Sequence, residues 1–160
     1  MQPIIEAIKK LFASYSQAPI ISVTKIPQSG SIRIYFRIIT ENKSFIATYG
    51  DNVKENQAFI YFSKEFKKKN CPVPEIYAIN EEQTIYIQED FGDISLLNKL
   101  EELGFVDEVY QLFQKSIVAL AHLQITGDQG LDYTYCITSK EFGKQAILSD
   151  LLYFKYYFVL

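Results

Sequence analysis

The chain has 160 residues and a formal charge of −3, with 48% apolar and 22% charged residues. A chain of this length can bury one core of its own, so neither a metal nor a disulfide framework is needed for stability. The net charge is mild and the charges are spread along the sequence, which argues against the broad basic surface that a nucleic-acid partner needs.

The cysteines and the chain ends predict a cytoplasmic protein. Cys71 and Cys136 lie far apart and have no neighbours at metal-ligand spacing, so we interpret them as reduced thiols. The N-terminus lacks the pattern of a signal peptide. The apolar run at residues 151–160 is too short to span a bilayer and contains Lys155, so we expect no membrane partner.

The first half of the chain alternates between helix and strand patterns. Helical spacing of apolar residues predicts helices over residues 3–15 and 52–69, the second with Asp51 as its N-cap. The expected strands span residues 20–27, 32–40, 44–49, 75–79 and 84–89. The predicted fold class is therefore α+β, with a five-stranded antiparallel sheet in the order of a meander and the second helix packed on it.

A small polar turn, Ser29-Gly30-Ser31, leads directly into the second expected strand. Alternation there places Ile32, Ile34, Phe36 and Ile38 on one face and Ser31, Arg33, Tyr35 and Arg37 on the other. Small residues allow backbone N–H groups to approach an anion, so the turn could cover a phosphate. The alternative is a hairpin turn in which the glycine serves only geometry.

The helix at 52–69 carries an acidic residue on its apolar face. Glu55 shares that face with Phe59, Phe62 and Phe66, through which we expect the helix to pack on the sheet. Because an unpaired buried carboxylate is costly, we expect Glu55 within ion-pair reach of Arg33 or Arg37. The alternative is a solvated acid favoured by the helix dipole.

The last expected strand runs into an acidic turn that contains glycine, at residues 90–93. Such a turn could act as a hinge whose main-chain groups bind the edge of a flat heterocycle. A plain connection from strand to helix is the alternative.

Everything after Asp93 has a helical pattern. A long amphipathic helix is expected near residues 106–125, with apolar residues on one face: Val106, Tyr110, Phe113, Ile117 and Leu120. Residues 138–141 form a capping-box pattern that predicts the start of a last helix. The only histidine, His122, is interpreted as a partly exposed helical residue and not as a catalytic one.

These features together resemble the N-terminal lobe of the aminoglycoside phosphotransferase and choline kinase superfamily, which is similar to the protein kinases. The resemblance rests on segments 29–38, 55–59, 72–76 and 88–93, and it is strongest to bacterial kinases of N-acetylated amino sugars. It implies a nucleotide-binding lobe at residues 1–88, a hinge at 89–94, and the helical start of a second lobe at 95–160.

The resemblance also implies the roles of particular residues. Ser29, Gly30, Ser31 and Arg33 would cover the phosphates of ATP, and Glu55 would match the glutamate of the moving helix. The main chain of Glu89, Asp90 and Phe91 would bind adenine. ATP and Mg²⁺ are the implied cofactors, and a sugar, amino sugar or aminoglycoside is the implied acceptor.

The sequence departs from the family pattern in three ways. Strand 44–49 lacks the lysine that usually contacts the phosphates, and Arg33 or Arg37 could replace it. Asp90-Phe91-Gly92 spells a metal-binding triplet of protein kinases but lies at the hinge, so we interpret it as a coincidence. No catalytic-loop aspartate, magnesium-binding asparagine or second aspartate is identifiable in the helical part.

We therefore expect that the chain is part of a longer kinase, has no catalytic residues of its own and is inactive alone. The apolar end at residues 158–160 has no helix-terminating residue, which favours this interpretation. We expect the segment 151–160 to dock onto the helical part or to form a homodimer. A non-catalytic, kinase-like binding or dimerisation module is the alternative.

Overall fold

The computed structural model describes residues 1–27, Gly30 and residues 32–159. It confirms an α+β fold with one five-stranded antiparallel sheet. The strands are β1 (Ile20–Lys25), β2 (Ile34–Thr40), β3 (Ser44–Tyr49), β4 (Ile76–Ile79) and β5 (Ile85–Glu89).

The strand order is β1-β2-β3-β5-β4, so the meander order expected from the sequence is wrong. The helix α2 (Val53–Lys68) follows β3 and carries the chain to the far edge of the sheet, where β4 forms. The turn at residues 80–84 then returns the chain as β5 into the gap beside β3. The C-terminal end of β5 is thereby placed inside the sheet, between β3 and β4, where Glu89 is paired with Phe45.

One face of the sheet forms the main core with the first helix, α1 (Gln2–Tyr15). The buried cluster on this face is made by Ile8, Phe12, Phe36, Ile38, Phe45, Ala47, Ile85 and Ile87. The alternation predicted for residues 32–40 is confirmed at Phe36 and Ile38. Ile32 precedes the strand and is 94% exposed, because β2 begins only at Ile34.

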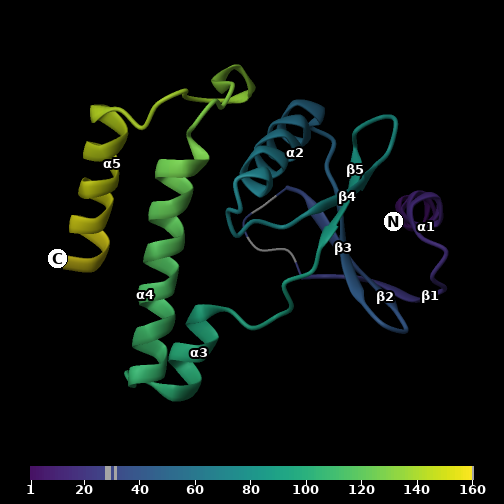
Figure 1. Ribbon diagram of the computed structural model, residues 1–160, viewed down its shortest axis with the longest axis horizontal. Helices are drawn as coiled ribbons and strands as arrows, with labels where there is room; N and C mark the ends of the chain where they lie inside the picture. Colours follow the sequence, from purple (N-terminus) through teal and green to yellow (C-terminus); the bar gives the residue numbers. More distant parts are fainter. Residues whose placement is uncertain (28–29, 31, 160) are drawn as a thin grey trace.

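Figure 1 shows α2 on the opposite side of the sheet from α1. Its N-cap is Asn52, not Asp51, because the Asn52 side chain accepts a hydrogen bond from the Glu55 N–H at 3.2 Å. The most buried side chains of α2 are Asn56, Ala58, Ile60 and Ser63.

The expected packing of α2 through three phenylalanines is confirmed only for Phe59. Its ring stacks on Tyr86 of the sheet at 5.3 Å. Phe62 and Phe66 are half-buried and stack on each other, and the Phe66 ring also packs against Gly127. The helical segment that follows the sheet, and not the sheet alone, therefore covers this end of α2.

The rest of the chain is helical and lies on the α2 side of the sheet (Figure 1). It contains α3 (Leu96–Leu103), α4 (Asp107–His122), a π-helical turn (Leu123–Gly127), a 3₁₀ turn (Tyr133–Tyr135), α5 (Lys144–Phe154) and a second π-helical turn (Lys155–Val159). None of the helices among the described residues has the length and apolar character needed to cross a membrane.

The C-terminal end of α4 is fastened to the end of α2 by polar contacts. Lys69 donates from Nζ to the carbonyl of Gly127 at 2.6 Å, and its own carbonyl lies 3.1 Å from His122 Nε2. Since a carbonyl only accepts, Nε2 carries a proton. His122 is half-buried, as the sequence predicted, and it joins two helices.

One expectation about the helical part is wrong. The capping-box pattern at 138–141 forms only a local turn, and α5 begins later, at Lys144, with Gly143 as its N-cap. The side chains near the C-terminus do not dock onto the helical part, since Leu151 is 58% and Phe158 71% exposed, and the alternative of a homodimer stays a prediction. Leu160 lies outside the described residues.

The apolar face predicted on α4 is also open to solvent. Tyr110 and Ile117 are 64% and 66% exposed. The sequence therefore predicted the apolar face correctly, but no described element covers it.

Candidate functional site

The sheet face toward α2 carries polar and aromatic side chains and one isoleucine at its centre. Alternation along the strands places them opposite the core positions. They are Tyr35 and Arg37 from β2, Ile46 and Thr48 from β3, and Tyr86 and Gln88 from β5.

Arg33 and Glu55 form an ion pair that joins the start of β2 to the first turn of α2. Arg33 donates from Nη2 to Oε1 of Glu55, which confirms the predicted pairing of Glu55 with one of the two arginines. The Arg33 side chain is 16% exposed, and its Cζ lies 5.2 Å from the centre of the Phe59 ring. The carboxylate and the aromatic ring together hold the guanidinium in one place.

Electrostatics keep Arg33 charged despite its burial. Burial opposes the charged form, but the nearby Tyr86, Glu55 and Tyr35 outweigh it and raise the pKa of Arg33. For Tyr86, burial dominates and raises the pKa to about 12, although the neighbouring Arg33 partly offsets it. A permanent positive charge therefore lies beside a neutral phenol under physiological conditions.

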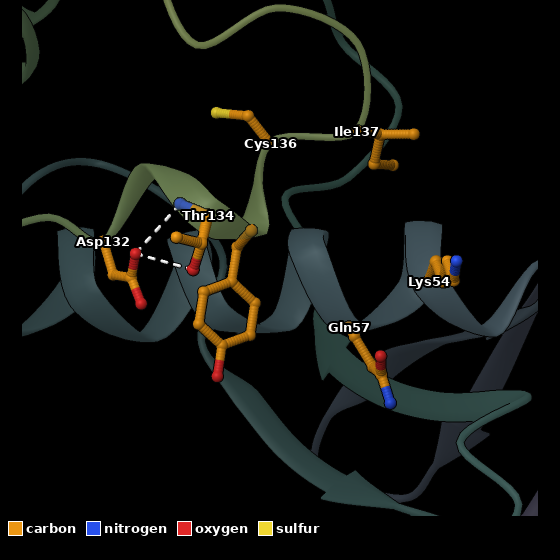
Figure 2. A pocket seen from close by; sticks show the side chains of 7 residues that line it. Lys54, Gln57, Asp132, Thr134, Cys136 and Ile137 are labelled. Carbon is orange, nitrogen blue, oxygen red and sulfur yellow. Dashed lines mark hydrogen bonds between the residues drawn. The ribbon is translucent and has the colours of Figure 1, made fainter.

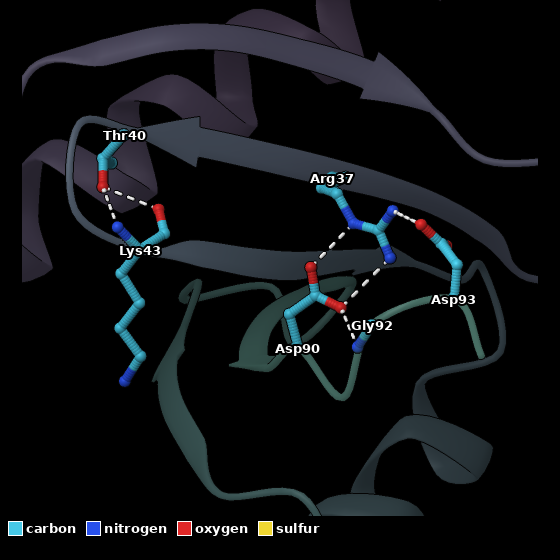
Figure 3. A network of polar contacts seen from close by, with 6 residues as sticks. All are labelled: Arg37, Thr40, Lys43, Asp90, Gly92 and Asp93. Atoms are coloured by element: carbon cyan, nitrogen blue, oxygen red, sulfur yellow. Dashed lines mark hydrogen bonds and ion pairs between the residues drawn. The ribbon is translucent and has the colours of Figure 1, made fainter. Parts of the chain in front are cut away.

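The turn after β5, which the sequence predicts to be a hinge and which keeps that name below, is held by a second arginine (Figure 3). Arg37 donates from Nε and Nη2 to the two carboxylate oxygens of Asp90, at 2.7 and 3.1 Å, and from Nη1 to Asp93 at 2.6 Å. Asp90 also accepts from the Gly92 N–H at 2.8 Å. We call this group of three charged residues the hinge clasp.

Burial and charge act in opposite directions on Asp90, whose side chain is only 3% exposed. Burial alone would raise its pKa, but the hydrogen bonds from Arg37 and Gly92 outweigh this and lower the pKa. The bonds to Asp93 and Asp90 raise the pKa of Arg37. The sequence predicts a hinge at Asp90 but not the hinge clasp, because β2 and the hinge meet only through the strand order.

The hinge also presents main-chain groups to solvent. Among the described residues, none makes a hydrogen bond to the N–H or C=O of Phe91, whose side chain is 64% exposed. The Glu89 side chain accepts from Lys67 at 3.1 Å, which lowers the Glu89 pKa and ties the hinge to the end of α2. A hollow of 270 Å³ lies at this place, lined in part by Ile26, Ile46 and Phe91.

The remaining residues predicted for the site say less about nucleotide binding. Gly30 has a positive φ of 66°, a conformation that glycine adopts without strain, whereas Ser29 and Ser31 lie outside the described residues. Lys43, the lysine nearest to β3, donates to Tyr77 Oη at 3.0 Å and lies over the Phe45 ring of the main core. Lys43 therefore belongs to the α1 side and is not part of this site.

A larger hollow, of 500 Å³, lies between α2 and the Tyr133–Tyr135 turn (Figure 2). Three of its polar side chains, Gln57, Asp132 and Thr134, already bond to one another or to nearby residues. Asp132 accepts from the N–H and hydroxyl of Thr134, at 2.9 and 2.7 Å, and Gln57 donates to Gln83 at 2.8 Å. The Asp132 pKa is lowered by these bonds from Thr134. The sheet face, where Arg37 lies beside the main-chain groups of the hinge and Arg33 joins the other end of β2 to α2, is the better candidate site.

Neither a model of a known protein family nor a curated protein matches the chain. Within residues 1–27, 30 and 32–159, no group of three histidine, cysteine, aspartate or glutamate side chains is placed to hold a metal ion. The function has to be argued from the geometry of the sheet face and the hinge.

Proposed function

We propose that this chain is the ATP-binding portion of a small-molecule phosphotransferase, of the sugar, amino-sugar or aminoglycoside kinase type. The observation that carries the proposal is the ion pair between Arg33 and Glu55, which joins the sheet to α2. The cost of burying an unpaired carboxylate predicts a cation for that glutamate, and the resemblance to the aminoglycoside phosphotransferase and choline kinase superfamily implies that Glu55 matches the glutamate of the moving helix.

The hinge supports the same proposal. Adenine offers a hydrogen-bond donor and an acceptor side by side on one edge, and the Phe91 main chain has one N–H and one C=O with no partner among the described residues. The adjacent hollow of 270 Å³ is slightly smaller than the roughly 300–1,000 Å³ of usual ligand pockets. A hollow of this size fits a site that encloses the adenine base on one side only.

In this proposal the chain's own residues position the nucleotide. Phe91 orients the base at the hinge, Ile46 contacts its face, and Gly30 lies in the turn that covers the phosphates. ATP supplies the phosphoryl group, while the Mg²⁺ ligands, the catalytic base and the acceptor site belong to a longer gene product. A cytoplasmic location fits this use of ATP.

A second candidate is a non-catalytic, kinase-like binding or dimerisation module. The observation that favours it is the set of exposed aromatic side chains on α5 and the turn after it, such as Phe154 at 55% and Tyr157 at 70% exposed. An apolar surface of this kind is typical of a protein contact.

Nuclear magnetic resonance of the isotope-labelled chain tests nucleotide binding, since it detects weak complexes. Adenosine is expected to shift the Phe91 amide signal, and guanosine, whose edge carries a different donor and acceptor pattern, is expected to shift it much less. Phe91→Pro removes the N–H and should abolish the preference for adenosine, whereas the matched control Phe91→Ala keeps the N–H and should retain it. Equal responses to both nucleosides, or none at Phe91, would contradict the proposal.

Phosphate transfer is tested on the longer gene product with ATP, Mg²⁺ and a panel of N-acetylated hexosamines, aminoglycosides and choline. Consumption of ATP with one acceptor class is the expected result. A longer product that is inert across the panel would favour the binding module instead.

A further inference from the structure

We propose that α4 and α5 pack with the same two helices of a second copy of this chain and form a four-helix bundle. The proposal does not depend on nucleotide binding, because both helices follow the residues that line the hollow at the hinge. It assigns a counterpart to the exposed surface of α5, namely the open face of α4.

The open face of α4 has the spacing of a helix-bundle seam. Tyr110, Phe113, Ile117 and Leu120 follow one another at intervals of three or four residues. A repeat of this kind, about 3.5 residues on average, inserts the side chains of one helix between those of another. We call these four residues the α4 seam. Their side chains are between 40% and 66% exposed, so the seam is not used within one copy.

α5 carries a second seam with the same spacing. It consists of Ile147, Leu151, Phe154 and Phe158, and we call it the α5 seam. Phe158 lies in the following π-helical turn, and its ring stacks on that of Phe154 at 5.7 Å, so the seam continues past the end of α5. No residue of α5 is buried, although the structure describes the whole helix.

The width of the apolar surface on α5 favours a bundle over a simple pair of helices. Leu148 and Leu152 lie on one side of the α5 seam. Tyr153 and Tyr157, whose rings stack at 4.4 Å, lie on the other. A helix that is apolar on all sides needs more than one neighbour to cover it. Folding onto α4 of the same chain would supply one neighbour, whereas a bundle with a second copy supplies two for every helix.

The exposed area is sufficient for a dimer. A large apolar side chain at half exposure presents about 100 Å², so the two seams offer roughly 800 Å² per copy, the share of one partner in a standard interface. Two-fold symmetry closes such an assembly at two copies, since each copy contributes the same pair of helices.

Charge favours antiparallel neighbours in the bundle. Asp107 begins α4, and Lys155 directly follows α5. Packing α4 of one copy antiparallel to α5 of the other brings these opposite charges to the same end. Figure 1 shows that α5 already runs in the opposite direction to α4 within one copy, as an up-and-down bundle requires.

Sedimentation velocity of the whole chain at increasing concentration tests the bundle, and wild type is expected to form dimers. Ile117→Asp places a charge in the α4 seam and should raise the dissociation constant of the dimer about a hundredfold or more. Val118→Asp is the matched control, because Val118 is as exposed as Ile117, at 69% against 66%, but is turned by about 100° around the helix. It should keep the dissociation constant within about threefold of wild type.

A second pair of variants makes the same comparison on α5. Leu151→Asp lies in the α5 seam and should abolish dimers, whereas Ser149→Asp, on the opposite side of the helix, should retain them. Circular dichroism identifies any variant that fails to fold, and Leu120→Asp provides a second test of the α4 seam. Amide hydrogen exchange of wild type should slow in both helices as dimers form.

Three results would overturn the proposal. Monomers at all concentrations would contradict it, and slow exchange in α4 and α5 of such monomers would show that α5 folds onto its own chain instead. Dimers that are lost in Leu151→Asp but retained in Ile117→Asp and Leu120→Asp would show that α5 pairs without α4. An equal loss in Ile117→Asp and Val118→Asp would show that any exposed apolar residue of α4 is sufficient and that the seam is not specific.

Discussion

Replacement of Asp90 by asparagine should destabilise the protein through the hinge clasp. The carboxylate is 3% exposed and receives two hydrogen bonds from Arg37, at 2.7 and 3.1 Å. The asparagine side chain would have the same size, but it would lack the charge and turn a donating amide group toward the arginine. Removing one partner of a buried pair costs about 3–5 kcal/mol, and we expect the lower end because Arg37 keeps Asp93 as a partner.

A loss of about 3 kcal/mol corresponds to a fall in melting temperature of roughly 6–12 °C for a chain of this size. The assay is thermal and urea unfolding of Asp90→Asn followed by circular dichroism at pH 7. Asp93→Asn is the matched control. Its carboxylate is 75% exposed, so its removal should cost less than about 1 kcal/mol.

The pH dependence gives a second, independent readout. The folded-state pKa of Asp90 lies below its unfolded value, so its contribution is complete above about pH 4 and is lost as the pH falls through the folded pKa. The stability difference between wild type and Asp90→Asn should therefore shrink as the pH is lowered from 5 toward about 3. A melting temperature within about 2 °C of wild type at pH 7, or an equal difference at pH 3 and pH 7, would refute this reasoning.

Two further predictions concern the core and the exposed helical surface. Phe36→Ala should lower the free energy of unfolding by about 3–5 kcal/mol because the side chain is fully buried in the core that packs against α1. Ile39→Ala is the control and should lower it far less, since the Ile39 side chain is 38% exposed. Equal losses in urea unfolding would show that the core is misassigned. We also expect the apolar surface of α5 to bring two copies together, so light scattering should detect concentration-dependent dimers that Phe154→Asp combined with Phe158→Asp abolishes. Monomers at all concentrations would contradict a homodimer through this segment.

Local chemistry was enough to predict most of the helices and strands. Alternation in β2 predicted its buried residues Phe36 and Ile38, since side chains of a strand point to opposite faces whatever their partners are. The helical period likewise placed Glu55 on the inner side of α2, near the arginines of β2. The hinge turn after β5 also follows from residue types, because its acidic residues and glycine end the apolar strand.

Tertiary structure alone decided how these elements combine. The insertion of β5 between β3 and β4 depends on long-range strand pairing, which no local pattern specifies, and it brings Asp90 to Arg37, 53 positions away in the sequence. The choice of Arg33 as the partner of Glu55 depends on how the start of β2 and the first turn of α2 meet, 22 positions apart in the sequence. The sequence by itself determined which side chains are apolar, charged or small. The packing of the sheet against two helices determined which of these side chains meet, because contacts between distant residues form only when the whole sheet is assembled.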